Sequence, residues 1–65
     1  MKNGTKRADI KSGMQVNIVL KEDQDIGLLT WGVVRDILTK SATHPHGIKV
    51  RLMTREVGRV KEILS

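Results

Sequence analysis

The segment His44-Pro45-His46 holds both histidines of the chain, and histidine is the side chain that most often binds metal ions in proteins. A zinc site needs three or four ligands. The chain has no cysteine and no third histidine to complete such a set. The pattern therefore indicates a pair of loop histidines, and we expect neither a metal nor another cofactor.

Ser41, His44 and Asp36 have the side-chain types of a nucleophile, a base and an acid in hydrolases. No glycine-framed nucleophile turn surrounds Ser41, and these residue types occur together by chance in most chains. The acidic segment 22–25 lacks the closing ligands of a calcium-binding loop. A domain of 65 residues also has little room for an enclosed pocket. We expect a protein that is not an enzyme.

Positive charge is the stronger signal. Twelve lysine and arginine residues against seven aspartate and glutamate residues give a net charge of +5. Such a surplus attracts polyanions through counterion release, although it is equally compatible with a basic protein that binds none. The candidate nucleic-acid-binding residues are Trp31 and the bases within the predicted strands, which are Arg35, Lys49, Arg51, Arg59 and Lys61.

Lys49 and Arg51 alternate with apolar residues, which places both on one solvent face of a strand. A surface that follows a phosphate backbone needs a fixed row of cations of this kind. Lysine and arginine also occur on edge strands, where they prevent edge-to-edge aggregation. The spacing therefore fits both a binding face and a solvated edge.

Trp31 is the only aromatic residue apart from the histidines. Proteins that bind single strands usually stack bases on several aromatic rings. If Gly32 and Val34 point inward, Trp31 points outward and offers a stacking surface. If Val33 is the buried residue, Trp31 belongs to the core. Its partner in the internal repeat described below is Val57, an ordinary core residue, which favours partial burial.

Hydrophobic alternation at a period of two predicts four strands. Val16, Ile18 and Leu20 show this spacing, and it recurs from Ile48 to Leu52. Residues 1–9 are polar and show no periodicity, which indicates a flexible basic arm ahead of a single domain over 10–65. The predicted strands cover 14–20, 28–38, 48–52 and 57–63, with loops over 21–27, 39–47 and 53–56.

The chain repeats one pattern twice. Residues 31–38 align without gaps on residues 57–64, with glycine, valine, base, acid, isoleucine and leucine in the same order. Arg35 and Lys61 occupy equivalent points, and in regular strands the acids that follow them, Asp36 and Glu62, face the opposite side. Upstream, a glycine opens each half, and the two halves read as similar hairpins.

Two similar hairpins predict an all-β domain that packs as a sandwich or a barrel, and we expect a small barrel of four to five strands. Gly32 inside the second strand suits the bulges, bends and close backbone approaches that are common in small barrels. Val60, Ile63 and Leu64 also have the three-to-four spacing of a helix. A short C-terminal helical turn is therefore an alternative to the end of the last strand.

Several segments resemble a family of short uncharacterised proteins called YwbE-like, and they cover nearly the whole predicted domain. The turn over 53–56 departs from the glycine-containing turn expected of that family before Val57. The resemblance brings no established activity. The matching segments are Gly13-x-x-Val16, Ile18-Val19-Leu20-Lys21, Asp23-Gln24, Leu29-Thr30-x-Gly32, Asp36-Ile37-Leu38-Thr39, His44-Pro45-His46-Gly47-Ile48-Lys49-Val50-Arg51-Leu52 and Val57-Gly58-Arg59-Val60.

The segment Gly32-x-Val34-x-x-Ile37 also resembles the glycine-centred core of KOW motifs. That resemblance covers few positions. It implies an SH3-like barrel that contacts RNA or a protein of the transcription or translation machinery.

These observations together predict a non-catalytic module that binds RNA or another nucleic acid through a basic strand face. The partner would be RNA or a component associated with the ribosome or transcription. The alternative is a protein-interaction module, or a homodimer that associates through strand edges. No segment has the length and apolar character of a membrane span or of a secretion signal, so we expect a cytoplasmic protein without membrane contact.

Overall fold

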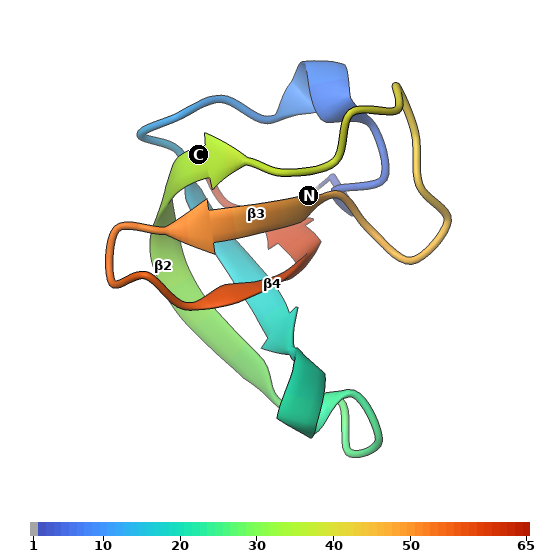
Figure 1. The fold of residues 1–65 in the computed structure, drawn as a ribbon, viewed down its shortest axis with the longest axis vertical. Helices are drawn as coiled ribbons and strands as arrows, with labels where there is room; N and C mark the ends of the chain where they lie inside the picture. Colours follow the sequence, from blue (N-terminus) through green and yellow to red (C-terminus); the bar gives the residue numbers. More distant parts are fainter. Residues whose placement is uncertain (1) are drawn as a thin grey trace.

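A computed structural model describes residues 2–65, which form a closed antiparallel barrel of four strands in the order β1-β2-β3-β4 (Figure 1). This confirms the prediction of a small all-β, SH3-like barrel built from two hairpins. The strands are β1 (Gln15–Leu20), β2 (Leu29–Ile37), β3 (Lys49–Leu52) and β4 (Val57–Ile63). Two short 3-10 turns, η1 (Arg7–Asp9) and η2 (Lys21–Asp23), precede β1 and follow it.

The core is formed by the inward residues of all four strands, as the period-two alternation predicts. Val16 and Ile18 of β1 meet Val34 of β2 in one cluster that is closed to solvent. Ile10 and Ile48, which lie outside the strands, complete it. The other members of the cluster are Val50, Leu52, Val60 and Ile63.

The two hairpins repeat each other in register as well as in sequence. Val34 N donates to Met14 O at 2.9 Å, and at the equivalent points Val60 N donates to Ile48 O at 2.9 Å. The barrel therefore has an approximate internal twofold relation between its halves. The equivalent cross-strand pairs are Gln15–Val33 and Lys49–Arg59, Val16–Gly32 and Val50–Gly58, and Asn17–Trp31 and Arg51–Val57.

Gly32 and Gly58 mark close approaches between strands. A β-carbon on Gly32 would meet the Leu52 side chain, and one on Gly58 would meet the backbone oxygen of Val19. These glycines let the strands cross tightly enough to close a barrel over so small a core. At Gly32 the close neighbour is the Leu52 side chain, and not the backbone approach that the sequence pattern suggested.

Each long strand carries one extra residue where the register shifts. On β2 the register passes from Val34 to Asp36 while β3 advances by one residue, which leaves Arg35 as the extra residue. Lys61 is the extra residue at the equivalent point of β4. The sequence reasoning placed the acids after Arg35 and Lys61 on the opposite face of a regular strand, but neither strand is regular at these points.

The turn between β3 and β4 is a tight hairpin, as predicted for residues 53–56. Arg55 N donates to Leu52 O and Leu52 N donates to Glu56 O, both at 2.8 Å. Arg55 has a φ of +76°, the left-handed conformation that a glycine usually supplies in such turns. The departure from a glycine-containing turn therefore changes the residue at this position and leaves the hairpin in place.

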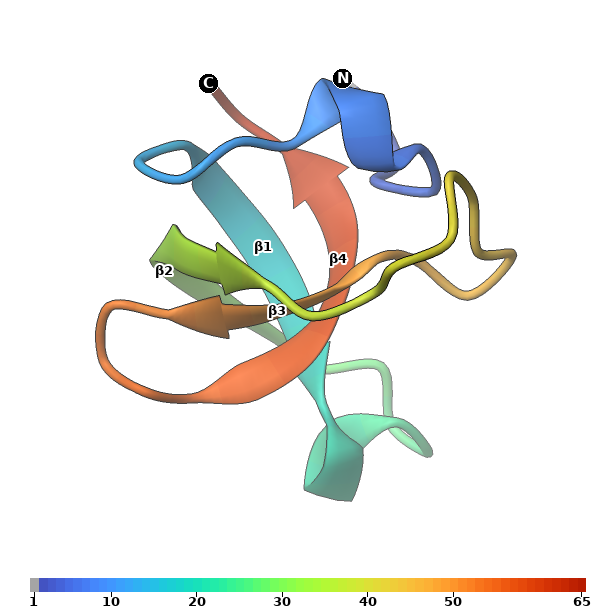
Figure 2. The same ribbon diagram turned by 45° about the horizontal axis from the view of Figure 1, so that its top comes forward.

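Residues 2–9, part of the predicted arm, run along the top of the barrel beside the 38–47 loop (Figure 2). Ile48 N donates to Gly4 O at 2.8 Å, and His44 N donates to Thr5 O at 3.0 Å. Lys2 also forms an isolated bridge with Ile63. The segment therefore holds the loop against the barrel. Met1, the first residue of the predicted arm, lies outside the described residues.

The strand ends lie within one residue of their predicted positions. β4 continues to Ile63, and Leu64 N then donates to Gln15 O at 2.9 Å. Pairing with β1 therefore takes the place of the alternative C-terminal helical turn. Among residues 2–65, the helical segments are the two three-residue turns, and neither is long enough to cross a membrane.

Candidate nucleic-acid interface

Arg59 lies at the centre of a cationic surface on the outside of the barrel. In the register, it stands opposite Lys49 of β3 on one side and opposite Val19 of β1 on the other. Two cations at directly opposed positions repel each other when no carboxylate lies between them. An arrangement of this kind is most favourable when an anion is shared between the two.

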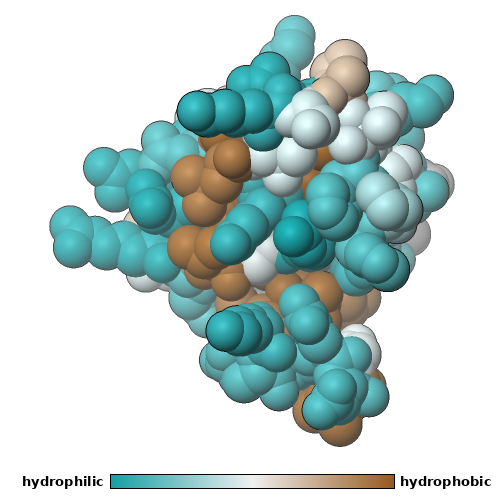
Figure 3. Space-filling model, turned by 45° about the vertical axis from the view of Figure 1, so that its right-hand side comes forward, coloured by the Kyte–Doolittle hydropathy of each residue, from teal (hydrophilic) through white to brown (hydrophobic). Residues whose placement is uncertain are grey.

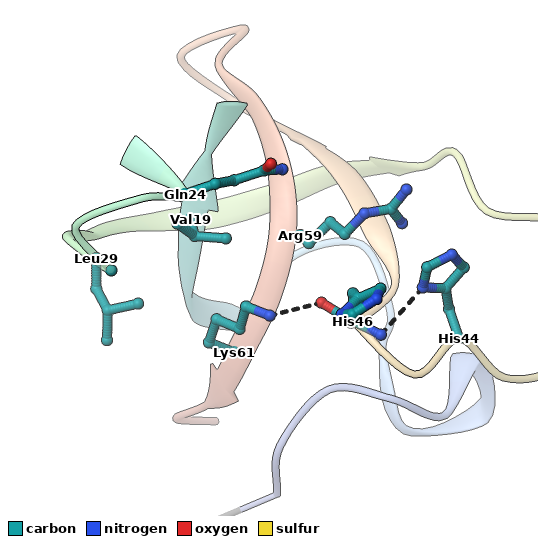
Figure 4. Close-up of a pocket in the computed structure, with 8 residues that line it drawn as sticks. Val19, Gln24, Leu29, His44, His46, Arg59 and Lys61 are labelled. Atoms are coloured by element: carbon teal, nitrogen blue, oxygen red, sulfur yellow. Dashed lines mark hydrogen bonds between the residues drawn. The ribbon is translucent and has the colours of Figure 1, made fainter. Parts of the chain in front are cut away.

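Arg59 and Lys61 are both anchored to the loop that precedes β3. The Arg59 guanidinium donates to Gly47 O at 3.1 Å, and Lys61 Nζ donates to His46 O at 2.7 Å. Figure 4 shows both side chains reaching toward this loop. Each cation has further N–H donors beyond the one that the carbonyl accepts. The loop therefore fixes the positions of the two charges while leaving them able to bind an anion.

His44 and His46 extend the surface beyond Lys61. The backbone N–H of His46 donates to His44 Nδ1 at 3.1 Å, and the two ring centroids lie 5.9 Å apart. Partial desolvation lowers the pKa of His44, and the charges of Arg59, His46 and Lys61 lower it further. His44 is therefore neutral at pH 7, which leaves Nδ1 free to accept this hydrogen bond and Nε2 protonated as a donor.

These residues line a groove of about 690 Å³. Val19 forms part of its wall. The Val19 side chain points outward from β1, but the residue is only 4% exposed. No aspartate or glutamate is among the residues that line this groove, so its charge is entirely positive. The lining residues are Val19, Gln24, Gly27, Leu29, His44, His46, Arg59 and Lys61.

A second groove, of about 400 Å³, adjoins the first. The two grooves share Val19, Gln24 and Arg59, and the second adds Lys21 and Lys49. No carboxylate lines it either. The cationic surface, defined as Lys21, Lys49, Arg59 and Lys61, is therefore continuous across both grooves.

The other two predicted bases have a different environment. Arg51 Nη1 lies 3.3 Å from Asp36 Oδ2, and Arg35 Nε lies 3.8 Å from the same oxygen. The bulge at Arg35 brings Asp36 opposite Arg51. The structure thus groups Lys49, Arg59 and Lys61 at the grooves, and it pairs Arg35 and Arg51 with a carboxylate.

Trp31 is 58% exposed, and Gly32 and Val34 are buried beside it. Of the two orientations considered from the sequence, the outward one is therefore correct, and the partial burial that its repeat partner Val57 favoured is not what the structure shows. Trp31 is paired with Asn17, whose Nδ2 donates to Glu62 Oε1 at 2.8 Å. It lies outside the residues that line the two grooves.

A family model described as "Uncharacterized conserved protein (DUF2196)" matches residues 3–63. The chain belongs to this family. "Uncharacterized protein YwbE" of Bacillus subtilis (strain 168) is 59% identical over 63 residues, which cover 97% of each chain. The predicted resemblance to YwbE-like proteins is thereby confirmed. No solved structure matched.

In this DUF2196 chain, sequence reasoning missed four residues of the grooves: His44, His46, Lys21 and Gln24. The histidines were considered as metal ligands, and His44 also as a catalytic base, but neither as part of an anion-binding surface. No group of three or more metal-binding side chains occurs among residues 2–65. The proximity of the histidines to Arg59 depends on the fold of the 38–47 loop. Neither periodicity nor residue spacing carries a signal for that contact.

Proposed function

We propose that this protein is a non-catalytic cytoplasmic module that binds RNA through Lys49, Arg59 and Lys61. The observation that carries the proposal is the directly opposed pair Lys49 and Arg59, beside two grooves that share Arg59 and have no carboxylate in their lining. Arrays of fixed cations of this kind contact phosphate groups without reading sequence. The weaker KOW-like resemblance of Gly32-x-Val34-x-x-Ile37 agrees with an RNA-contacting barrel, with a component of transcription or translation as its setting.

The anchoring of Arg59 and Lys61 adds support. A lysine or arginine that is free in solution loses side-chain entropy when it binds, at a cost of up to about 2 kcal/mol. Here the contacts with Gly47 O and His46 O restrict both side chains before any ligand arrives. Pre-organisation of this kind favours binding over a merely solvated basic face.

The test is fluorescence anisotropy with labelled oligouridylate over a range of salt concentrations. Three phosphate contacts on a single strand predict a log–log salt slope of about −2, because each contact contributes roughly −0.7. Arg59→Gln should weaken binding and make the slope about 0.7 less steep. Arg35→Gln is the matched control, since it removes the same charge from a residue paired with Asp36. No binding at low salt, or equal effects of the two variants, would contradict the proposal.

A protein partner is the second candidate, and exposed apolar residues favour it. Ile26 is 74% exposed and Leu28 is 57% exposed, both in the loop between β1 and β2. In the closed barrel each strand pairs with two others, so a homodimer through strand edges has less free edge than an open sheet offers. Light scattering over a range of concentrations distinguishes these cases, because a homodimer gains mass with concentration and a monomer does not.

A further inference from the structure

The outer surface beside the grooves is divided into an apolar strip and a cationic one. The register orders Leu29 on β2, Val19 on β1, Arg59 on β4 and Lys49 on β3 in one row across the barrel. Trp31 lies two residues along β2 from Leu29, on the same outward side. The apolar strip, defined as Leu29 and Trp31, is therefore separated from Arg59 by a single strand.

The two strips match the two sides of an unpaired nucleic-acid strand. Neighbouring strands lie about 4.8 Å apart, so β2 and β4 are separated by roughly 10 Å. Phosphates would lie over the cations of β4 and β3, and bases would turn toward β2. In a duplex the bases are stacked inside, and an exposed apolar strip has nothing to contact.

We propose that the ligand is single-stranded RNA, with at least one base stacked on Trp31 and its backbone on Arg59 and Lys61. This inference rests on the proposed function, and it adds the strand state and the orientation of the ligand. Trp31 is 58% exposed and Leu29 is 41% exposed, which leaves the indole accessible for stacking. Base stacking on one aromatic ring tolerates any sequence, as every base has a π-face.

The Glu62 carboxylate limits where the RNA backbone can cross the barrel. Trp31, Asn17 and Glu62 form the next outward-facing row, two register positions from Leu29, and Asn17 Nδ2 donates to Glu62 Oε1 at 2.8 Å. A phosphate over that carboxylate would be repelled. The RNA backbone therefore passes over the cations of β4 and β3, on the Arg59 side of Glu62.

The face drawn in Figure 3 agrees with narrow apolar patches and not with a broad apolar interface. Figure 3 shows hydrophobic surface on one face divided into patches by hydrophilic side chains. A stable protein interface usually needs a larger continuous apolar centre. The cations beside the strip also favour a polyanion as the occupant.

Trp31 itself supplies the measurement, because the chain has one tryptophan and no tyrosine or phenylalanine. Binding of oligouridylate should quench or shift its emission. Trp31→Ala should weaken oligouridylate binding about 5- to 150-fold, whereas Trp31→Phe should retain most of the affinity because the ring remains. The exposure of Trp31 makes both variants compatible with folding, which circular dichroism verifies.

An abasic oligonucleotide with the same number of phosphates separates this inference from the proposed function. We expect the wild type to bind it at least 5-fold more weakly than oligouridylate, and Trp31→Ala to bind both alike. Equal wild-type affinity for the two, unchanged emission, or a preference for duplex RNA would overturn the single-strand inference while leaving RNA binding in place. No binding of either oligonucleotide at low salt would overturn both.

Discussion

Gly58 of β4 lies against the backbone oxygen of Val19 in β1, with no room for a β-carbon between them. This approach brings the two strands together beneath Arg59, whose register partner in β1 is also Val19. The same contact therefore helps to close the barrel and shapes the grooves beside Arg59.

Gly58→Ala should destabilise the protein by about 2–3 kcal/mol, because the new methyl group can be accommodated only by moving backbone. Gly32→Ala is the matched control, since its methyl group meets the Leu52 side chain and not backbone. We expect a smaller loss there. Urea unfolding of the two variants measures the difference, and equal losses would contradict the role given to the Val19 carbonyl.

Arg55→Gly should stabilise the protein by about 0.5–1 kcal/mol. Arg55 has a φ of +76°, a conformation that costs an L-residue roughly 1–2 kcal/mol and glycine very little. The greater freedom of glycine in the unfolded chain offsets part of that gain. The urea midpoint provides the measurement. Thr54→Gly is the control in the same turn, and it should give no stabilisation.

Gly4→Ala should detach residues 2–9 from the barrel. Gly4 has a φ of +75°, and a β-carbon there would meet Val60. In the wild type, the Ile48 N–H donates to Gly4 O and the His44 N–H donates to Thr5 O. In the variant, both amide protons should exchange faster with solvent. The Val34 amide, bonded to Met14 O, should keep its rate. Unchanged exchange at Ile48 would show that the segment contributes no protection.

Folding stability should fall as the pH drops through the ordinary range of histidine. The pKa of His44 is lowered in the folded state by partial desolvation and by neighbouring positive charge, so the unfolded chain binds a proton more readily. Stability from this group is therefore full above pH 6.5 and decreases below it. Urea midpoints between pH 5 and 7.5 provide the measurement. His44→Asn should flatten this dependence, and parallel curves for the two proteins would contradict it.

The strands and the core follow from the sequence because one face of each strand must be buried. Val16, Ile18, Val50 and Leu52 lie inside as their alternation requires. The internal repeat extends this to the pairing of the strands, since equivalent residues take equivalent partners. The strands, the core and the equivalent pairing of the two hairpins can therefore be inferred from alternation and from the internal repeat.

The bulges and the grooves do not follow from such patterns. A base followed by an acid looks like ordinary alternation, so Arg35 and Lys61 give no sign of the extra residue. The groove forms where the 38–47 loop meets β4, and this depends on backbone hydrogen bonds to Gly4 and Thr5. Apart from the glycine required at position 4, these backbone contacts leave no signal in residue type.

The repeated register also allows the two halves of the molecule to be compared residue by residue. Lys49 and Arg59 have Gln15 and Val33 at the equivalent points of the first hairpin, so the opposed cations occur in one copy only. The two hairpins thus share a register and differ in charge at this cross-strand pair. Substituting Lys and Arg at Gln15 and Val33 would place a second cation pair on the first hairpin, which thus offers a scaffold for engineering a bivalent variant.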